Sequence, residues 1–230
     1  MFYDIPEIAR ILKNKLKDVG LTVNHRKVLH IVAHSMGGLV SRWFIEREGG
    51  NQVVQHLVML GTPNAGSPWS TVQDLATVAL GIGLNSFSTV AWPVKVLGSL
   101  VSGIEVVDVA LDQMKPNSSF LRDLAASPDP RIPYSVIAGN TSIKRAAMEE
   151  EGGKASRLNR LIQKLRTQIV EFPFLGQSND IAVKVDSIKN IPEGRNITPN
   201  IQEVACDHLT YFVENSKALT YLSEYLTQNE

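Results

Sequence analysis

The fold class is decided by one stretch of the sequence, Val28-Leu29-His30-Ile31-Val32-Ala33-His34-Ser35-Met36-Gly37-Gly38. Its first part, residues 28–33, is a short apolar run whose length and Val/Ile content predict a buried parallel strand. Two glycines follow the serine, and residues 39–48 then have the pattern of a helix that ends at Gly49. The serine at position 35 is therefore expected at a turn between a strand and a helix.

The segments on either side repeat this alternation of helices and strands. A helix is expected from Asp4, which can cap it together with Glu7, to Gly20. Further strands are predicted at residues 53–60, 132–138 and 196–205, and a final helix at residues 211–226. Because helices alternate with strands, the pattern predicts an α/β fold with a parallel sheet. For 230 residues we expect one domain, residues 1–230, interrupted by an insertion at about residues 64–124.

The composition argues against several classes of protein. The chain has 23 Lys and Arg residues against 23 Asp and Glu residues and no polybasic run, which argues against nucleic-acid binding. Its single cysteine, Cys206, has no partner for an internal disulfide and no metal-ligand spacing, which indicates a small packed residue. We expect neither a metal nor a cofactor. The first residues form an amphipathic segment and not the apolar segment of a secretory signal, so a cytoplasmic location is favoured. The uncharged residues 75–94 approach the length of a membrane span, but Pro93 and several Gly and polar residues favour an apolar insertion.

Residues 33–37 match the nucleophile-elbow pattern, with alanine at the first glycine position. Small residues two before and two after a serine leave room for a strained turn that projects the hydroxyl outward. The turn also places Ser35 at a helix N-terminus, where N–H groups stabilise developing negative charge. We therefore expect Ser35 to be a nucleophile and the N–H of Met36 to be an oxyanion donor. The alternative is a glycine-rich connection that carries an incidental serine.

A serine nucleophile needs a histidine base, which an acid in turn orients. In hydrolases with such an elbow the order is Ser, then Asp or Glu, then His, and of the five histidines only His208 completes it. His34 is next to the serine but is expected on the opposite side of the strand. Asp180 is the first choice of acid, Asp186 is the reserve and Asp207 the third choice. A capping or surface role for His208 and a plain turn role for Asp180 are the alternatives.

The chain resembles the bacterial lipase and esterase branch of the α/β-hydrolase superfamily, including relatives of the GPI inositol-deacylase type. The similar segments are His34 to Arg42 (the lipase elbow and following helix), Leu60 to Ser67 (the Gly-Thr-Pro segment that lines the pocket), Ser178-Asn179-Asp180 (the aspartate turn) and Asp207-His208-Leu209 (the catalytic-histidine loop). Ile181 stands where glycine is usual in the family. The resemblance implies a parallel sheet flanked by helices, an ester or lipid substrate, and substrate-binding roles for Gly61, Thr62 and Trp69.

One part of the family pattern does not occur in this sequence. In the family, a loop after an upstream strand, often His-Gly, supplies the second oxyanion N–H, and nothing before Ser35 has that form. We therefore expect an N-terminally truncated α/β-hydrolase fold, with the missing strands supplied by a longer chain or by a partner. A missing strand beside residues 28–33 would leave an apolar edge on the sheet.

The insertion after the Gly-Thr-Pro segment resembles a lipase lid and is expected to be helical. Over residues 69–113, Trp69, Phe87 and Trp92 can cover the serine and meet acyl chains, which indicates contact with a lipid interface. An extra helical layer packed as core is an equal alternative.

These observations lead to one principal expectation and two alternatives. The principal one is a serine hydrolase that cleaves carboxylic esters through a Ser-Asp-His triad and an acyl-enzyme. The first alternative is a hydrolase-like interaction module, weak or inactive because the oxyanion loop is missing. The second is an acyltransferase that uses the same serine.

Overall fold

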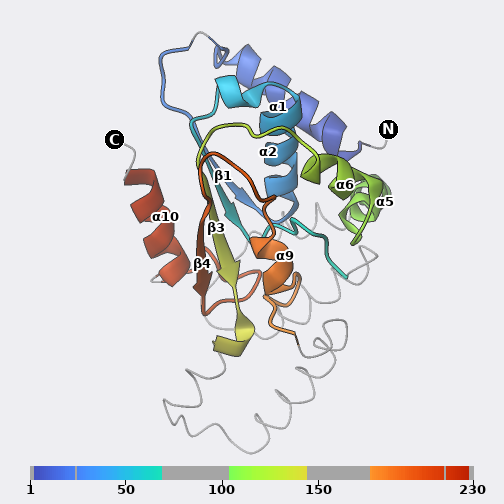
Figure 1. Ribbon diagram of the computed structural model, residues 1–230, viewed down its shortest axis with the longest axis vertical. Coiled ribbons are helices and arrows are strands. Elements are labelled where there is room, and N and C mark those ends of the chain that lie inside the picture. The colour runs from blue at the N-terminus through green and yellow to red at the C-terminus, as the bar shows by residue number, and fades with distance from the viewer. Residues whose placement is uncertain (1–2, 24, 69–103, 144–176, 215, 228–230) are drawn as a thin grey trace, which may run out of the picture.

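The computed structural model of the protein describes residues 3–23, 25–68, 104–143, 177–214 and 216–227. Within these residues a four-stranded parallel sheet has the strand order β1-β2-β3-β4 (Figure 1). The strands are β1 (His30–His34), β2 (His56–Leu60), β3 (Tyr134–Gly139) and β4 (Asn200–Val204). The predicted parallel α/β architecture is therefore confirmed.

Helices cover both faces of this sheet (Figure 1). One face carries α1 (Ile5–Asp18), α2 (Met36–Arg47), α5 (Ile104–Met114), α6 (Ser119–Ala125) and α9 (Val185–Lys189), and the other carries α10 (Lys217–Thr227). A short 3-10 helix, η1 (Gly50–Gln52), lies between α2 and β2. Successive side chains of a strand point to opposite faces. Accordingly, Met59 of β2 packs with the larger helical layer, whereas Leu60 packs with α10.

Helix α1 begins and ends close to where the sequence predicts. The Oδ1 atom of Asp4 accepts a hydrogen bond from the N–H of Glu7 at 2.7 Å, which satisfies one of the free donors at the helix start. Ile5 and Ala9 are fully buried in the core that α1 shares with α2. Val19 lies within the predicted helix, but the observed helix ends at Asp18 and the side chain of Val19 is 68% exposed.

Strand β1 is shorter and less buried than the sequence predicts. It begins at His30, and the side chain of Val32 is 40% exposed. In the part of the chain that the structure describes, β1 pairs with β2 and has no strand beside its other edge. The exposure of Val28, 64%, just before β1 agrees with the apolar edge expected from the sequence.

The final helix begins six residues later than the sequence predicts. Helix α10 starts at Lys217, where the hydroxyl of Ser216 accepts a hydrogen bond from the N–H of Leu219 at 3.2 Å. Tyr211, the predicted first residue, lies in the loop before the helix with its side chain fully buried. This difference brings Tyr211 close to the candidate site described below.

Part of the predicted insertion lies outside the described residues, including Trp69, Phe87, Trp92 and the uncharged stretch 75–94. Its last part forms α5 and α6, whose Leu111 and Leu124 are buried in the core beside α2. The lid hypothesis and the domain limits therefore stay predictions. Among the described helices, none combines the length and the apolar character that crossing a membrane requires.

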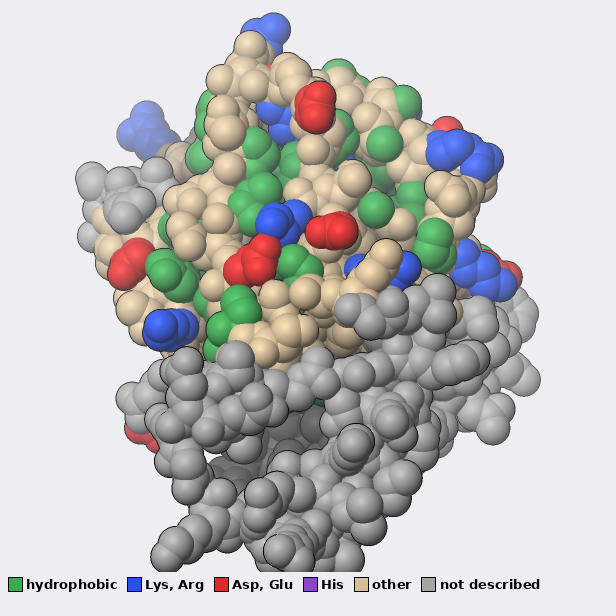
Figure 2. Space-filling view, turned by 60° about the horizontal axis from the view of Figure 1, so that its bottom comes forward, with side chains coloured by type: hydrophobic (Ala, Val, Ile, Leu, Met, Phe, Trp, Pro, Cys, Tyr) green, Lys and Arg blue, Asp and Glu red, His purple; other side chains and the backbone are tan. Residues whose placement is uncertain are grey.

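The surface that Figure 2 shows carries charged side chains of both signs. On the described part of this face, Lys and Arg side chains lie interspersed with Asp and Glu side chains. Such a mixed distribution creates no strong field of one sign over that part of the surface.

Candidate active site

Ser35 lies in the tight turn between β1 and α2. Its backbone has φ +54° and ψ −132°, a strained conformation for a residue with a side chain. The N–H of Ser35 donates to the carbonyl of Leu60 at 2.9 Å, which ties the turn to the end of β2. A methyl group at Gly38 would overlap Thr62 Oγ1 and lie 2.6 Å from Thr62 Cγ2. The close contact between α2 and the segment after β2 therefore requires glycine at position 38.

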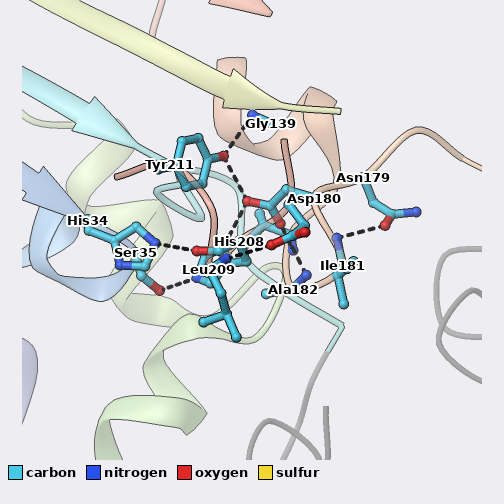
Figure 3. A network of polar contacts seen from close by, with 12 residues as sticks. His34, Ser35, Gly139, Asn179, Asp180, Ile181, Ala182, His208, Leu209 and Tyr211 are labelled. Carbon is cyan, nitrogen blue, oxygen red and sulfur yellow. Dashed lines mark hydrogen bonds and ion pairs between the residues drawn. The ribbon is translucent and has the colours of Figure 1, made fainter. Parts of the chain in front are cut away.

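His208 lies in the loop after β4 and joins Ser35 to Asp180 (Figure 3). Its Nε2 is 2.9 Å from Ser35 Oγ, and its Nδ1 is 2.7 Å from Asp180 Oδ2. Because a carboxylate only accepts hydrogen bonds, Nδ1 carries the proton and Nε2 accepts from the serine hydroxyl. The structure thus brings the three predicted residues into one continuous chain of hydrogen bonds.

The carboxylate of Asp180 is fully buried and accepts four hydrogen bonds. Oδ1 accepts from the N–H groups of Ala182 at 3.1 Å and Val183 at 2.7 Å. Oδ2 accepts from His208 Nδ1 and from the hydroxyl of Tyr211 at 2.9 Å. The backbone carbonyl of Asp180 also accepts from the N–H of His208 at 2.7 Å. A buried carboxylate requires such partners, and this one has donors on both oxygens.

The turn that presents Asp180 is strained at the next residue. Ile181 has φ +84°, in the left-handed region that β-branched residues avoid. Its N–H donates to Asn179 Oδ1 at 2.8 Å. This conformation explains why glycine is usual at this place in the family that the sequence resembles. Keeping isoleucine there costs roughly 1–3 kcal/mol.

The two other candidate acids have different surroundings. Asp186 is exposed on α9. Asp207 is buried in the histidine loop, where its Oδ1 accepts from the N–H of Leu209 at 3.1 Å. The acid that the structure brings to His208 is therefore Asp180.

His34 lies against the loop that carries His208. Its Nε2 lies 2.9 Å from the backbone carbonyl of His208, and the centroids of the two imidazole rings are 4.6 Å apart. Since a carbonyl only accepts, Nε2 of His34 carries a proton. Burial and the neighbouring His208 lower the pKa of His34 from 6.5 to about 4. His34 is therefore a neutral donor at pH 7 that fixes the backbone of the histidine loop.

The residues predicted to bind substrate have different surroundings. Gly61 has φ +59° and lies against the Asp180–His208 pair. Thr62 is fully buried beside Gly38, and Trp69 lies outside the described residues. The substrate-binding roles of all three stay predictions.

Met36, the predicted oxyanion donor, is the first residue of α2. The N–H of a residue at this position has no acceptor within its own helix. It is therefore available, by helix geometry, to a group bound beside Ser35. This role of Met36 also stays a prediction.

A second buried network holds the segment after β2. The guanidinium of Arg42 donates to Glu46 Oε1 at 2.9 Å and to Asn64 Oδ1 at 3.0 Å. The side-chain amide of Asn64 donates in turn to the carbonyl of Ile188 at 2.7 Å. The network links α2, the Gly-Thr-Pro segment and α9, so it fixes the framework beneath Ser35. In the described ranges, no group of three or more His, Cys, Asp or Glu side chains is arranged to hold a metal ion.

The family of the chain follows from a family model. The model for a domain of unknown function, DUF7379, matches residues 5–227. The chain belongs to this family. Among curated proteins, no sequence matches this DUF7379 chain.

Several solved structures are similar to the DUF7379 chain. The metagenomic carboxyl esterase MGS0156 has a TM-score of 0.54 and 17% identity, covering 99% of this chain and 63% of the esterase. The monoacylglycerol lipase of Paleococcus ferrophilus has a TM-score of 0.53 and 13% identity, covering 99% of this chain and 77% of the lipase. The type II thioesterase BorB from the borrelidin biosynthetic cluster has a TM-score of 0.52 and 14% identity, covering 98% of this chain and 74% of the thioesterase.

These similarities show that the DUF7379 chain has the α/β-hydrolase fold. The chain spans only part of the length of each of these proteins. It spans 32% of the length of a further match, phospholipase PlaB from Legionella pneumophila in complex with thio-NAD. Because fold does not fix chemistry, the activity has to be argued from the site itself.

Proposed function

We propose that this chain is a serine hydrolase that cleaves carboxylic esters. One observation carries the proposal: Ser35 Oγ, the ring of His208 and the buried carboxylate of Asp180 are joined by hydrogen bonds of 2.9 Å and 2.7 Å. A nucleophile, a base and an acid that orients the base need this arrangement. The esterase and lipase among the similar structures support the choice of an ester substrate.

The first half of the reaction acylates Ser35. Oγ attacks the carbonyl carbon of the ester while Nε2 of His208 takes the hydroxyl proton, and Asp180 stabilises the resulting imidazolium. The carbonyl oxygen becomes an oxyanion, which the N–H of Met36 at the start of α2 stabilises. The bond to the alcohol oxygen then breaks, and that oxygen takes the proton from Nε2. The products of this half are a free alcohol and an acyl ester on Ser35.

The second half releases the acid. Nε2 of His208 takes a proton from water, whose oxygen attacks the acyl carbonyl and forms a second oxyanion. The bond to Ser35 Oγ breaks, and Oγ recovers the proton from His208. A carboxylic acid leaves, and the three side chains return to their starting protonation states. Throughout, Asp180 stays ionised and keeps the proton of the neutral ring on Nδ1.

The variant Ser35→Ala tests the proposal on p-nitrophenyl esters of increasing acyl length. We expect kcat to fall on the order of 10⁶-fold, because the nucleophile is absent. The matched control is Ser223→Ala, at an exposed position on α10. A fluorophosphonate probe should label the wild-type chain and the control but not Ser35→Ala. Turnover retained by Ser35→Ala would contradict the proposal, and the acyl-length series reports whether long apolar chains are preferred.

A weak or inert interaction module is the second candidate function. It is favoured by one observation, that among the described residues no strand lies beside the outer edge of β1 to carry a second oxyanion donor. Losing one such donor typically costs about 10²–10³ in rate. A folded wild-type chain whose Ser35 resists the fluorophosphonate probe would support this candidate over the hydrolase.

A further inference from the structure

Tyr211 is a fully buried residue in the loop that carries His208. Its ring lies 6.3 Å from the ring of His208 and 5.6 Å from the ring of His34, both centroid to centroid. The close-up in Figure 3 shows its hydroxyl between Gly139, at the end of β3, and the carboxylate of Asp180. None of the steps proposed above assigns a role to this residue.

The direction of both hydrogen bonds of the Tyr211 hydroxyl is fixed by its partners. The N–H of Gly139 can only donate, so at 2.7 Å the hydroxyl oxygen accepts from it. The hydroxyl has one proton, which goes to Oδ2 of Asp180 at 2.9 Å. Oδ2 is the same oxygen that accepts from His208 Nδ1. The same carboxylate oxygen therefore accepts hydrogen bonds from both the tyrosine hydroxyl and the imidazole.

We propose that Tyr211 is a positioning residue of the hydrolase. Through its hydrogen bond to Asp180, it sets the orientation of the His208 ring and the basicity of that ring. The inference rests on the proposed function and adds a fourth residue to its machinery. A methyl group at Gly139 would lie 2.8 Å from the Tyr211 oxygen and 3.0 Å from Asp180 Cβ. Glycine at the end of β3 thus admits both groups, and its N–H aligns the hydroxyl.

The ionisable groups around this hydroxyl keep it in the donor form. Burial and the neighbouring Asp180 raise the pKa of Tyr211 well above 10, so the hydroxyl stays protonated wherever an esterase is assayed. Within the described residues, His34 at the end of β1 and Cys206 after β4 are titratable groups that also face the Asp180–His208–Tyr211 cluster. Gly61, directly after β2, and Gly139, the last residue of β3, also lie against the cluster, and neither has a side chain that titrates.

The variant Tyr211→Phe tests the role because it keeps the buried ring and removes only the hydroxyl. With one donor fewer on Oδ2, the carboxylate attracts the imidazolium of His208 more strongly. We expect the acid limb of kcat/KM against pH to move upward by about half a unit. We expect kcat to fall about tenfold with little change in KM, because the lost hydrogen bond is made to a charged group. The midpoint of the NMR titration of the His208 ring should move in the same direction.

Tyr134→Phe is the matched control. Tyr134 is also buried, and its hydroxyl donates to a buried carboxylate oxygen, Glu46 Oε1, at 3.0 Å. Tyr134 is the first residue of β3, whereas Gly139 is the last. The Tyr134→Phe variant therefore removes the same kind of hydrogen bond at the far end of the same strand. We expect this control to lower stability without moving the acid limb or the His208 titration. If both variants lose stability alike and neither moves the titration, Tyr211 is purely structural and the proposal is overturned.

Site-specific replacement of Tyr211 by 3-fluorotyrosine provides a test that keeps the ring and the hydroxyl. Fluorine makes the phenol a stronger donor, so the acid limb and the His208 titration should move to lower pH, opposite to Tyr211→Phe. An unchanged midpoint in this protein overturns the proposal even if Tyr211→Phe does not fold. The NMR titration needs no turnover, so it separates the two proposals. A shifted midpoint in a chain that cleaves no ester refutes the hydrolase and retains the coupling of Tyr211 to His208 through Asp180.

Discussion

Gly61 lies directly against the carboxylate of Asp180. A methyl group at position 61 would lie 2.8 Å from Oδ2 and 3.0 Å from His208 Nδ1. The end of β2 therefore supplies backbone, and no side chain, to the space where the acid and the base meet. The next residue, Thr62, packs on Gly38 beneath Ser35. The Gly-Thr-Pro segment thus supports the nucleophile turn and leaves room for the Asp180–His208 pair.

The first prediction concerns Gly61→Ala. The added methyl group must displace the carboxylate or the imidazole, and the positive φ of +59° adds backbone strain. We expect kcat for ester hydrolysis to fall by about 10²-fold or more, since a displacement of about 1 Å can cost that much. Gly20→Ala is the control, because Gly20 has φ +79° but nothing within 4 Å of the added methyl group. Equal activity of the two variants would show that the space beside Asp180 does not matter.

Asp180→Asn provides the second prediction. The amide keeps the shape of the side chain, but it cannot carry the charge that stabilises the imidazolium and the Nδ1–H form of His208. We expect kcat to fall by about 10⁴-fold in a chain that still folds, as circular dichroism would report. Asp186→Asn, at an exposed position on α9, should retain wild-type kcat. A large loss in Asp186→Asn and a small one in Asp180→Asn would reverse the assignment of the acid.

The third prediction contrasts two neighbouring glycines in the first turn of α2. Gly38→Ala places a methyl group 2.7 Å from Thr62 Cβ, in a fully buried site, so something in the core must shift. We expect a loss of unfolding free energy of about 1–3 kcal/mol, measured by urea denaturation. Gly37→Ala meets only the Cβ of Ala33 at 3.9 Å and should be neutral or stabilising by up to about 1 kcal/mol. Similar stability of the two variants would contradict the packing argument.

Local patterns in the sequence predict the architecture and the principal candidate residues. The apolar run before Ser35, the two glycines after it and the serine-acid-histidine order each depend on a short stretch of chain or on position along it. They predict the strand, the turn and the choice of Asp180 and His208. The Asp4 cap of α1 is equally local, and the structure confirms it.

Contacts that depend on distant loops could not be predicted in this way. Tyr211 was predicted as the first residue of the final helix, but it lies in a loop, where its hydroxyl donates to Asp180, 31 residues earlier in the sequence. The hydrogen bond between His34 and the backbone of His208 was not foreseen either, because the two residues lie 174 positions apart in the sequence. Burial of β1 was overestimated because a strand sequence does not reveal whether a neighbour covers its outer edge.

The last prediction concerns acid stability and His34. Its pKa is lowered from 6.5 to about 4 in the folded chain, first by burial and then by His208. Between these two values the unfolded chain binds a proton that the folded chain does not bind, so stability falls as the pH falls from about 6.5 towards 4. At 1.36 kcal/mol per pH unit, this histidine alone removes up to ~3 kcal/mol.

His34→Gln isolates this effect, because glutamine does not titrate and its amide can still donate to the carbonyl of His208. We expect its unfolding free energy, from urea denaturation at pH 7, 6, 5 and 4, to fall less steeply than that of the wild type. His56 has a pKa that is also lowered, first by burial and then by His30, but it is present in both proteins and cancels in the comparison. Parallel curves for the two proteins would mean that His34 takes up its proton in the folded chain as readily as in the unfolded one. The ring would then be charged beside His208 in weak acid, and its role as a neutral donor to the histidine loop would have to be abandoned.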